Sequence, residues 1–228
     1  MAQFHFVEDY EALVSQLLHD HPLDEAMSLA VGGDYERVGA IESAILAYAG
    51  LRDGDIVFDL GCGSGRLAHA LGRRHRIDYY GTDVVQALLD YAAKKSPANY
   101  RFKLNRELSI PMLPHSVDIA CAFSVFTHLL QAESYVYLRE MRRALKPGGR
   151  IVFSFLEFAA PEHWSVFKDT LANQHKGVNG HLNMFMERSA IDSWCERLGY
   201  ERVEFIDGDA APWGGEPLWQ SLAILRKP

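Results

Sequence analysis

A glycine-rich segment that begins with an acidic residue carries the clearest chemical signal in the sequence. The segment is DLGCGSGR, residues 59–66, and it follows the apolar run IVF. Glycines at the end of a strand permit a tight turn and let backbone amides approach a ligand. Dinucleotide folds bind a pyrophosphate there through GxGxxG. Here the spacing is GxGxG, Arg66 occupies the third glycine position and Asp59 would repel a pyrophosphate. The segment therefore indicates a nucleotide-like ligand with positive character.

A second acidic residue follows about twenty residues after the glycines. Asp83 comes at the end of the predicted strand 77–82, where a carboxylate can accept hydrogen bonds from both hydroxyls of a ribose. Val84 comes next and can lie on the face of an adenine. Either acid alone is also typical of a cap or a turn. Asp59, Asp83 and the glycine segment together predict an adenosine-shaped site.

A histidine after the fourth predicted strand is a candidate for acid–base chemistry. His128 lies in VFTHL, residues 125–129, and its imidazole can act as a general base toward a hydroxyl or an amine. The competing interpretation is a histidine at a helix start that bonds to backbone. A metal site is not expected, because Cys62, Cys121 and Cys195 lie far apart and neither CxxC nor HExxH occurs.

Strands and helices alternate along the chain in the order typical of a parallel sheet with helices on both faces. Strands are predicted at 55–60, 77–82, 100–104, 117–124, 150–155, 201–206 and 221–225. Helices are predicted at 36–49, 66–71, 85–94, 133–145 and 189–198, after one or two short helices between residues 10 and 34. The glycine segment and Asp83 then lie at the carboxyl edge of the sheet, where open α/β folds bind ligands.

The composition narrows the class of partner. The 228 residues include 23 Lys and Arg against 30 Asp and Glu, a formal net charge of −7, and the basic residues come in short pairs. Nucleic-acid affinity depends on phosphate contacts, so a nucleic-acid partner is not expected. No apolar run reaches the roughly 20 residues of a membrane span, and the first residues do not have the pattern of a signal peptide. Scattered cysteines fit a cytoplasmic location.

Four segments in order give the sequence a family resemblance. DLGCGSGRLA, GTDVV, IPMLPHSVDIACAFSVFTHL and LKPGGRIVFSF resemble the successive motifs of class I S-adenosylmethionine-dependent methyltransferases. The resemblance extends from about residue 31 to residue 155. It implies an α/β, Rossmann-like, doubly wound sheet of seven strands, mostly parallel with the last strand antiparallel and with helices on both faces. It also implies S-adenosylmethionine as the cofactor.

The resemblance assigns cofactor contacts to individual residues. Many relatives carry an aspartate after the third strand that reaches the adenine amine, and this chain has Asn105 or Glu107 there instead. The amide oxygen of Asn105 can accept the same hydrogen bond. Ser64 is expected to contribute backbone only. The residues expected to bind the cofactor are Asp59, Gly61, Cys62, Gly63 and Gly65 for methionine, Asp83 for ribose, Val84 and Asn105 for adenine, and Phe123 and Ser124 near the sulfonium.

These observations predict a methyltransferase that acts on the oxygen or nitrogen of a small-molecule acceptor, with His128 as the candidate base. Relatives that methylate base or amide nitrogens carry an Asn-Pro-Pro-Tyr motif after the fourth strand, where this chain has FSVF, residues 123–126. One alternative is a non-catalytic protein that binds the cofactor or acts as a scaffold. Another is a nicotinamide-dependent oxidoreductase, which Arg66 and Asp59 disfavour. The chain is expected to be a monomer or a homodimer.

The sequence also suggests a division of the chain. Residues 1–50 are predicted to form an N-terminal helical cap, and residues 51–228 a methyltransferase domain with a lid-like insertion at about 156–189. In the cap, Tyr35 and Arg37 are candidate contacts to the cofactor carboxylate or to substrate. The insertion combines aromatic, methionine and polar side chains, which suit an acceptor pocket or simply bury a helix against the sheet. These candidates are Glu157, His163, Trp164, Phe167, His175, Asn179, His181, Asn183, Met184, Phe185 and Met186.

Overall fold

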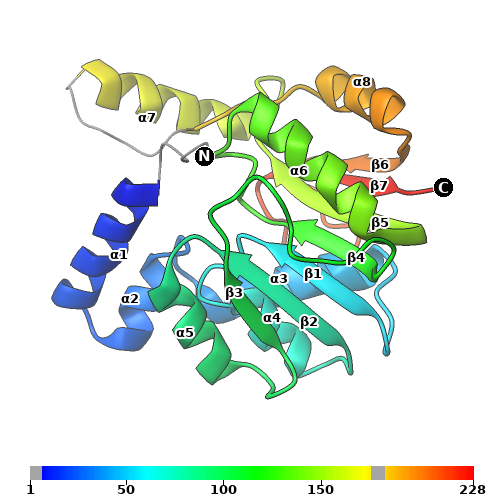
Figure 1. Cartoon of the computed structure of the whole chain (residues 1–228). Coiled ribbons are helices and arrows are strands. Elements are labelled where there is room, and N and C mark those ends of the chain that lie inside the picture. Colours follow the sequence, from blue (N-terminus) through cyan, green and yellow to red (C-terminus); the bar gives the residue numbers. More distant parts are fainter. Residues whose placement is uncertain (1–6, 176–182) are drawn as a thin grey trace.

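A single seven-stranded sheet forms the centre of the molecule, in a computed structural model that describes residues 7–175 and 183–228 (Figure 1). The strands are β1 (Ile56–Leu60), β2 (Asp78–Asp83), β3 (Arg101–Leu104), β4 (Val117–Ala122), β5 (Leu145–Phe155), β6 (Glu201–Ile206) and β7 (Ser221–Arg226). Their order in the sheet is β3-β2-β1-β4-β5-β7-β6. The first five strands pair in parallel, and β7 is antiparallel to both β5 and β6. The predicted fold class is therefore confirmed.

Helices cover both faces of this sheet (Figure 1). They are α1 (Val7–Asp20), α2 (Leu23–Leu29), α3 (Tyr35–Tyr48), α4 (Arg66–Gly72), α5 (Gln86–Lys95), α6 (Gln131–Ala144), α7 (Trp164–His175) and α8 (Arg188–Leu198), with a short 3₁₀ helix η1 (Pro161–His163). Apolar residues of α3, α4 and α5 form the core on one face, and those of α6 and α8 form the core on the other. Within the two described ranges, no helix has the length and apolar character needed to cross a membrane.

The buried strands explain the continuous apolar runs in the sequence. Successive side chains of a strand point to opposite faces, and Val57 and Phe58 of β1 are both completely buried. Val57 packs in the core with Ile45 of α3, whereas Phe58 packs in the core with Met141 of α6. A strand covered on both faces needs apolar residues at every position. Asp59 is thus a buried carboxyl group in an apolar strand, which requires a specific reason.

The first two helices, α1 and α2, form a packing unit with α5, apart from the two main cores. Val14 of α1 and Met27 of α2 belong to a small apolar cluster with Leu88 of α5. The hydroxyl of Tyr10 donates to the carbonyl of Ala30 at 3.0 Å, which ties the two N-terminal helices together. The unit therefore lies beside the carboxyl edge of the sheet, because α5 follows directly from the end of β2.

The boundary between α6 and β5 differs from the prediction. The sequence predicts a helix to Leu145 and a strand from residue 150, but α6 ends at Ala144 and β5 begins at once. The segment KPGG belongs to the strand as an irregularity in its pairing opposite Val117 and Ile119 of β4. Gly148 accommodates it with a φ of 80°. A glycine-containing bulge is read in sequence as a break between two elements, although the pairing continues past it.

The fourth strand also ends earlier than predicted. It stops at Ala122 rather than at Ser124. Ser124 has a φ of 56°, a left-handed conformation that non-glycine residues seldom adopt, and its backbone N–H donates to Ser154 Oγ at 2.7 Å. Phe123 and Ser124 therefore belong to the loop at the carboxyl edge of the sheet.

Candidate functional site

A cavity of about 440 Å³ opens where β1, β2 and β4 end. Small-molecule sites span roughly 300–1,000 Å³, so one compact ligand fits this space. Residues from three loops and from α1 and α6 border it, although they are far apart in the sequence. The cavity is lined by these residues predicted from the sequence: Asp59, Gly61, Cys62, Gly63, Asp83, Val84, Asn105, Phe123, Ser124 and His128.

The loop between β1 and α4 adopts a conformation that requires glycine. Gly61 and Gly63 have φ angles of 67° and 56°, in the left-handed region. A Cβ on Gly61 would come within 2.5 Å of Val125 Cγ2, and a Cβ on Gly63 within 2.6 Å of Val31 Cγ1. Neither contact can be tolerated without movement. The two glycines therefore let the loop pass closely between its neighbours and expose backbone to the cavity.

Three sequence candidates do not line the cavity. Gly65 precedes α4 with a φ of 82°, and a Cβ there would lie 2.6 Å from Ala92 Cβ, so this glycine permits α4 to approach α5. The hydroxyl of Tyr35 donates to the carbonyl of Ser64 at 3.1 Å and supports the loop from outside. Arg37 forms ion pairs with two exposed carboxylates instead of facing the cavity.

The carboxylate of Asp83 fastens the glycine loop to the end of β2. One oxygen accepts the backbone N–H of Gly63 at 2.9 Å and the other accepts the backbone N–H of Val85 at 3.0 Å. Burial raises the pKa of Asp83 to about 6, although these backbone donors oppose the rise. Each carboxylate oxygen retains acceptor capacity after these bonds. Ribose hydroxyls are donors that suit it.

Asp59 lies at the floor of the cavity in a group of buried charges. The hydroxyl of Tyr79 donates to its carboxylate, and burial raises the pKa of Asp59 to about 7. Glu42 is also buried, and it pairs with Arg66 at 2.6 Å. Burial raises the pKa of Glu42, opposed by Arg66. Arg66 is paired with Glu42 and lowers the pKa of Asp59 only weakly, so a cationic ligand would stabilise the charged form of Asp59.

Val84 and Asn105 line the side of the cavity next to Asp83. The backbone N–H of Asn105 donates to the carbonyl of Asp83 at 2.9 Å, which places the residue at the end of β3. Its side-chain Nδ2 donates to the carbonyl of Ser109 at 2.6 Å. Of the two residues predicted after the third strand, Asn105 lines the cavity and Glu107 does not.

His128 is half-buried and lines the cavity from the loop after β4. Its backbone N–H donates to the carbonyl of Val125 at 2.9 Å in a turn, and α6 begins only at Gln131. His128 therefore lies in the loop three residues before α6 rather than in the first turn of the helix. Within residues 7–175 and 183–228, no group of three or more His, Cys, Asp or Glu side chains is placed to hold a metal ion.

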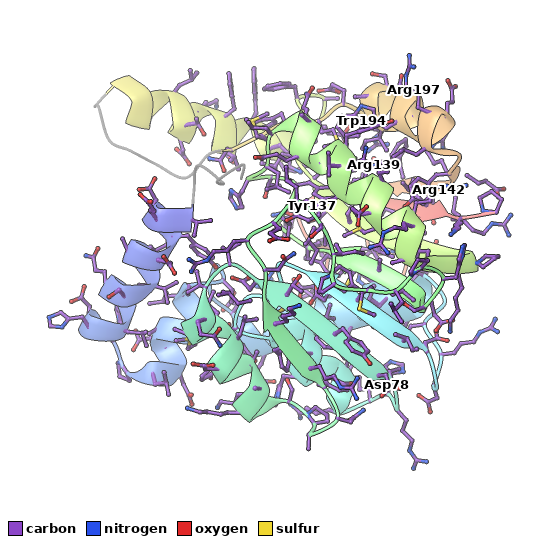
Figure 2. All side chains as sticks on the ribbon, in the orientation of Figure 1. Asp78, Tyr137, Arg139, Arg142, Trp194 and Arg197 are labelled. Carbon is purple, nitrogen blue, oxygen red and sulfur yellow. The ribbon has the colours of Figure 1, made fainter. Side chains whose placement is uncertain are left out.

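Several cavity residues were not predicted from the sequence. Tyr10 and Leu13 reach the cavity from α1, where their spacing of three places them on one helical face. Tyr137 reaches it from α6 (Figure 2), and its hydroxyl donates to the carbonyl of Glu107 at 2.9 Å. Gln220 reaches it from the residue before β7. Helical periodicity marks Tyr10 and Leu13 as an apolar face, but no pattern shows which surface that face covers.

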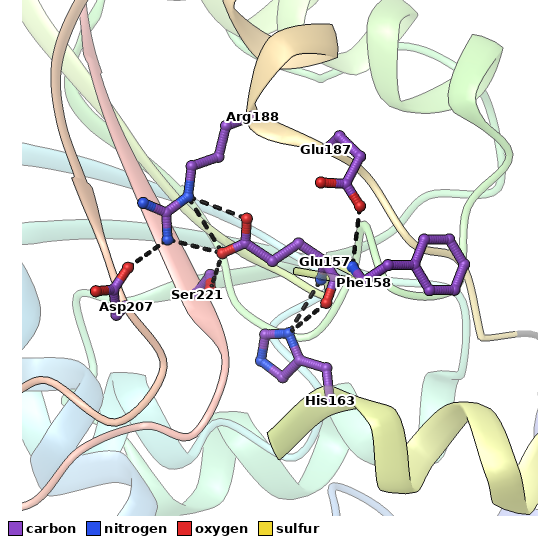
Figure 3. A network of polar contacts seen from close by, with 7 residues as sticks. All are labelled: Glu157, Phe158, His163, Glu187, Arg188, Asp207 and Ser221. Atoms are coloured by element: carbon purple, nitrogen blue, oxygen red, sulfur yellow. Dashed lines mark hydrogen bonds and ion pairs between the residues drawn. The ribbon is translucent and has the colours of Figure 1, made fainter. Parts of the chain in front are cut away.

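The segment from 156 to 189 lies beside the cavity loops rather than in the lining, as far as its residues are described. The buried Glu157 pairs with Arg188 at 2.7 Å and accepts the hydroxyl of Ser221 at 2.6 Å (Figure 3). His163 Nδ1 accepts the backbone N–H of Glu157 at 3.0 Å. These two candidates thus have structural partners. Asn179, His181 and the side chain of His175 lie outside the described residues.

Comparison with known proteins agrees with this geometry. The family model described as "Methyltransferase domain" matches residues 58–153. Demethylmenaquinone methyltransferase of Deinococcus radiodurans is 34% identical over 146 residues, 61% of this chain and 55% of the relative. A tRNA (carboxymethyluridine(34)-5-O)-methyltransferase of Macaca fascicularis is 32% identical over 63% of this chain and 20% of the relative. Magnesium protoporphyrin IX methyltransferase of Synechocystis PCC 6803, solved with bound SAH, has a TM-score of 0.67 at 15% identity, covering 98% of this chain and 97% of that structure.

The fold and the cavity define a Rossmann-like protein that binds its ligand at the carboxyl edge of the sheet. The match of residues 58–153 to a methyltransferase domain, with the named relatives and the shared fold, supports a class I S-adenosylmethionine-dependent methyltransferase, whose cofactor is S-adenosylmethionine. It spans a little over half the length of its curated relatives, 55%, 58% and 59% of the first three. The residues present fit this cofactor, because two buried acids, Glu42 and Asp59, line the cavity where a cationic group would lie, and the Asp83 carboxylate retains acceptor capacity for hydroxyl donors.

Proposed function

We propose that this chain is an enzyme that transfers a methyl group from S-adenosylmethionine to the oxygen or nitrogen of a small-molecule acceptor, in the cytoplasm. The observation that carries the proposal is the position of Asp83, whose carboxylate holds the glycine loop and faces the cavity. Dinucleotide folds also carry an acid at the position of Asp83, but the buried carboxylate of Asp59 at the base of the loop would repel a pyrophosphate and suits a cationic sulfonium ligand. The nicotinamide alternative is therefore disfavoured.

Each part of the cofactor has a matching group in the cavity. Asp83 would accept the ribose hydroxyls, and Asn105 would accept the adenine amine beside Val84. Asp59 would balance the positive charge of the methionine part, next to the backbone of Gly63. When bound, the cofactor supplies a methyl group on a sulfonium, for which neutral sulfur is a good leaving group.

The protein's own contribution is to position the acceptor and to move a proton. Phe123 and Ser124 line the cavity beside His128 at the end of β4. An in-line arrangement of acceptor and methyl group supplies much of the rate enhancement. His128 would take the proton from a hydroxyl or amine acceptor as the new bond forms. A base at this place is useful only for an acceptor that loses a proton.

A small acceptor is favoured by the charge of the chain. The net charge of −7 disfavours the binding of a polyanion such as a nucleic acid. The cavity accommodates one compact ligand and little more. By their names, the proteins compared above act on demethylmenaquinone, on a tRNA and on magnesium protoporphyrin IX. We also propose that residues 1–50 form a cap over the cofactor, since Tyr10 and Leu13 line the cavity, and that the lid-like insertion at about 156–189 borders the acceptor.

The test is to follow a labelled methyl group. The protein is incubated with S-adenosylmethionine carrying a trideuterated methyl group and, separately, with the small-molecule, tRNA and protein fractions of one cell extract. Mass spectrometry then finds the label. We expect label in the small-molecule fraction with wild type and a strong loss with Asp83→Asn. Label in the tRNA or protein fraction alone would overturn the small-molecule proposal, and label in none would overturn methyl transfer.

A further inference from the structure

Four aromatic rings form a cluster outside the cavity lining, between the end of β5 and α7. Phe158 stacks on Phe185 with ring centroids 4.4 Å apart and planes 9° apart. Trp164 stacks on Phe167 at 4.9 Å and 6°. The two pairs meet edge to face, with Phe158 and Phe167 at 5.3 Å and 87°. We call these four residues the aromatic cluster.

Two members of the aromatic cluster present large areas to solvent. Phe158 is 48% exposed and Trp164 is 46% exposed, whereas Phe167 and Phe185 are half-buried beneath them. Leu171 of α7 is exposed as well. A contiguous exposed apolar patch on a protein of this kind marks a place where something binds. If the rings served only to fix α7 on the sheet, the largest of them would not be half-exposed.

The chain connects the aromatic cluster directly to the cavity. The backbone N–H of Met184 donates to the carbonyl of Thr127 at 2.8 Å, next to the cavity residue His128. Phe185 pairs with Leu156 as an isolated bridge. Consecutive Cα atoms are about 3.8 Å apart and paired strands about 5 Å apart, so the Cα atoms of Phe185 and His128 lie within about 13 Å. The cluster therefore borders the same loop that holds the candidate base.

We propose that the aromatic cluster binds the flat conjugated part of the acceptor while the acceptor's hydroxyl or amine reaches the cavity near His128; this inference rests on the proposed function. Aromatic rings attract other rings through offset-stacked and edge-to-face contacts, beyond the burial of area. The exposed rings of Trp164 and Phe158 offer such contacts, and the Glu187 carboxylate beside them already accepts the backbone N–H of Phe158 at 2.9 Å. An uncharged planar ring system is the chemistry that this surface selects.

The test uses two probes of the same carbon skeleton. 2-Naphthol is planar and aromatic, whereas decahydro-2-naphthol is saturated and bulky, and each carries one hydroxyl. Each probe is titrated by calorimetry into the protein saturated with S-adenosylhomocysteine. We expect 2-naphthol to bind at least tenfold more tightly than its saturated counterpart. Equal binding of the two would show general apolar attraction, and no binding of 2-naphthol would contradict the proposal; either result overturns it.

Variants assign the binding to the aromatic cluster. Phe158→Leu and Trp164→Leu keep apolar bulk but remove a ring, and each is expected to weaken 2-naphthol roughly threefold to tenfold. The matched control is Trp194→Leu, because Trp194 lies on α8 (Figure 2) and its ring contacts Tyr135. Unchanged naphthol affinity in both cluster variants overturns the assignment and leaves the surface to a protein partner. The affinity for S-adenosylhomocysteine is measured first in every protein. Wild-type affinity in a variant shows that the variant is folded. If wild type itself does not bind S-adenosylhomocysteine, the proposed function is refuted, whatever the result with naphthol.

Discussion

The amide of Gln220 donates to the hydroxyl oxygen of Ser124 at 3.1 Å, which joins the loop after β4 to the residue before β7 in the wall of the cavity. Both sides of this contact have unusual backbone. Ser124 has a φ of 56°, and Trp219, which precedes Gln220, has a φ of 63°. Left-handed non-glycine residues cost free energy and are concentrated at functional sites. The backbone on both sides of this pair is therefore strained, and the pair lies beside the end of β4, where the acceptor is expected.

Replacing Gln220 tests the role of this pair. Gln220→Met keeps the length of the side chain and removes its amide, so Ser124 loses this partner in the cavity wall. We expect the KM for the acceptor to rise about fivefold, because the lost hydrogen bond between Gln220 and Ser124 is worth about 1 kcal/mol, with little change in the affinity for S-adenosylhomocysteine. Steady-state kinetics and calorimetry measure the two quantities. An equal loss of both would place Gln220 at the cofactor instead.

His128 is tested by its effect on turnover. His128→Ala is expected to lower kcat by about 10²-fold, the usual contribution of general-base catalysis, and to leave cofactor affinity within twofold. The control is His75→Ala, because His75 precedes β2 at the opposite edge of the sheet. An undiminished kcat in the His128 variant would eliminate the proton-transfer role.

The raised pKa of Asp59 leads us to expect that the stability of the protein depends on pH. Its pKa in the folded protein is about 7, raised by burial, against about 3.9 in an unfolded chain. The folded state therefore binds the Asp59 proton more tightly than the unfolded state. The stability that this protonation contributes is fully present below about pH 4 and is lost as the pH rises to about 7. The slope is at most about 1.4 kcal/mol per pH unit.

Asp59→Asn removes this dependence while keeping an acceptor for the Tyr79 hydroxyl. Relative to wild type, we expect the cofactor-free variant to gain stability between pH 5 and pH 8 in urea unfolding. Asp209→Asn, on an exposed loop residue, is the control and should show no such gain. A difference between Asp59→Asn and wild type that stays constant with pH would refute the assigned protonation.

The ion pair of Glu157 is expected to be important for stability. Glu157 is 2% exposed, and Arg188 and Ser221 both bond to it (Figure 3). Glu157→Ala removes one of the carboxylate partners of Arg188 and the acceptor of the Ser221 hydroxyl. The free energy of unfolding should therefore fall by about 2–4 kcal/mol. The exposed pair of Glu201 and Arg226 provides the control, and Glu201→Ala should cost less than about 1 kcal/mol. Equal losses in the two variants would contradict the structural role of Glu157.

The sequence predicts those parts of the site that local rules determine. The apolar run into GxGxG specifies a strand, a turn and a helix, and Asp83 follows from the next strand end, so both arrive at the same edge of the sheet. The cofactor contacts predicted for Asp59, Gly63 and Asp83 depend only on this local order.

Contributions from distant parts of the chain could not be predicted in the same way. Tyr10, Tyr137 and Gln220 reach the cavity from α1, from α6 and from the start of β7. Their positions depend on how layers pack, and a single sequence gives the apolar face of a helix but not the surface it covers. Gly65 shows the reverse case, because it belongs to the motif yet permits close packing of two helices at Ala92.

The most direct test of the central claim is a calorimetric titration of wild type and Asp83→Ala with S-adenosylhomocysteine and with NADH. We expect micromolar binding of S-adenosylhomocysteine to wild type, no binding of NADH, and at least a tenfold loss of affinity in the variant, since the carboxylate then no longer accepts hydroxyl donors or the N–H of Gly63. Binding of NADH alone, or unchanged affinity of Asp83→Ala for S-adenosylhomocysteine, would contradict the assignment of this cavity.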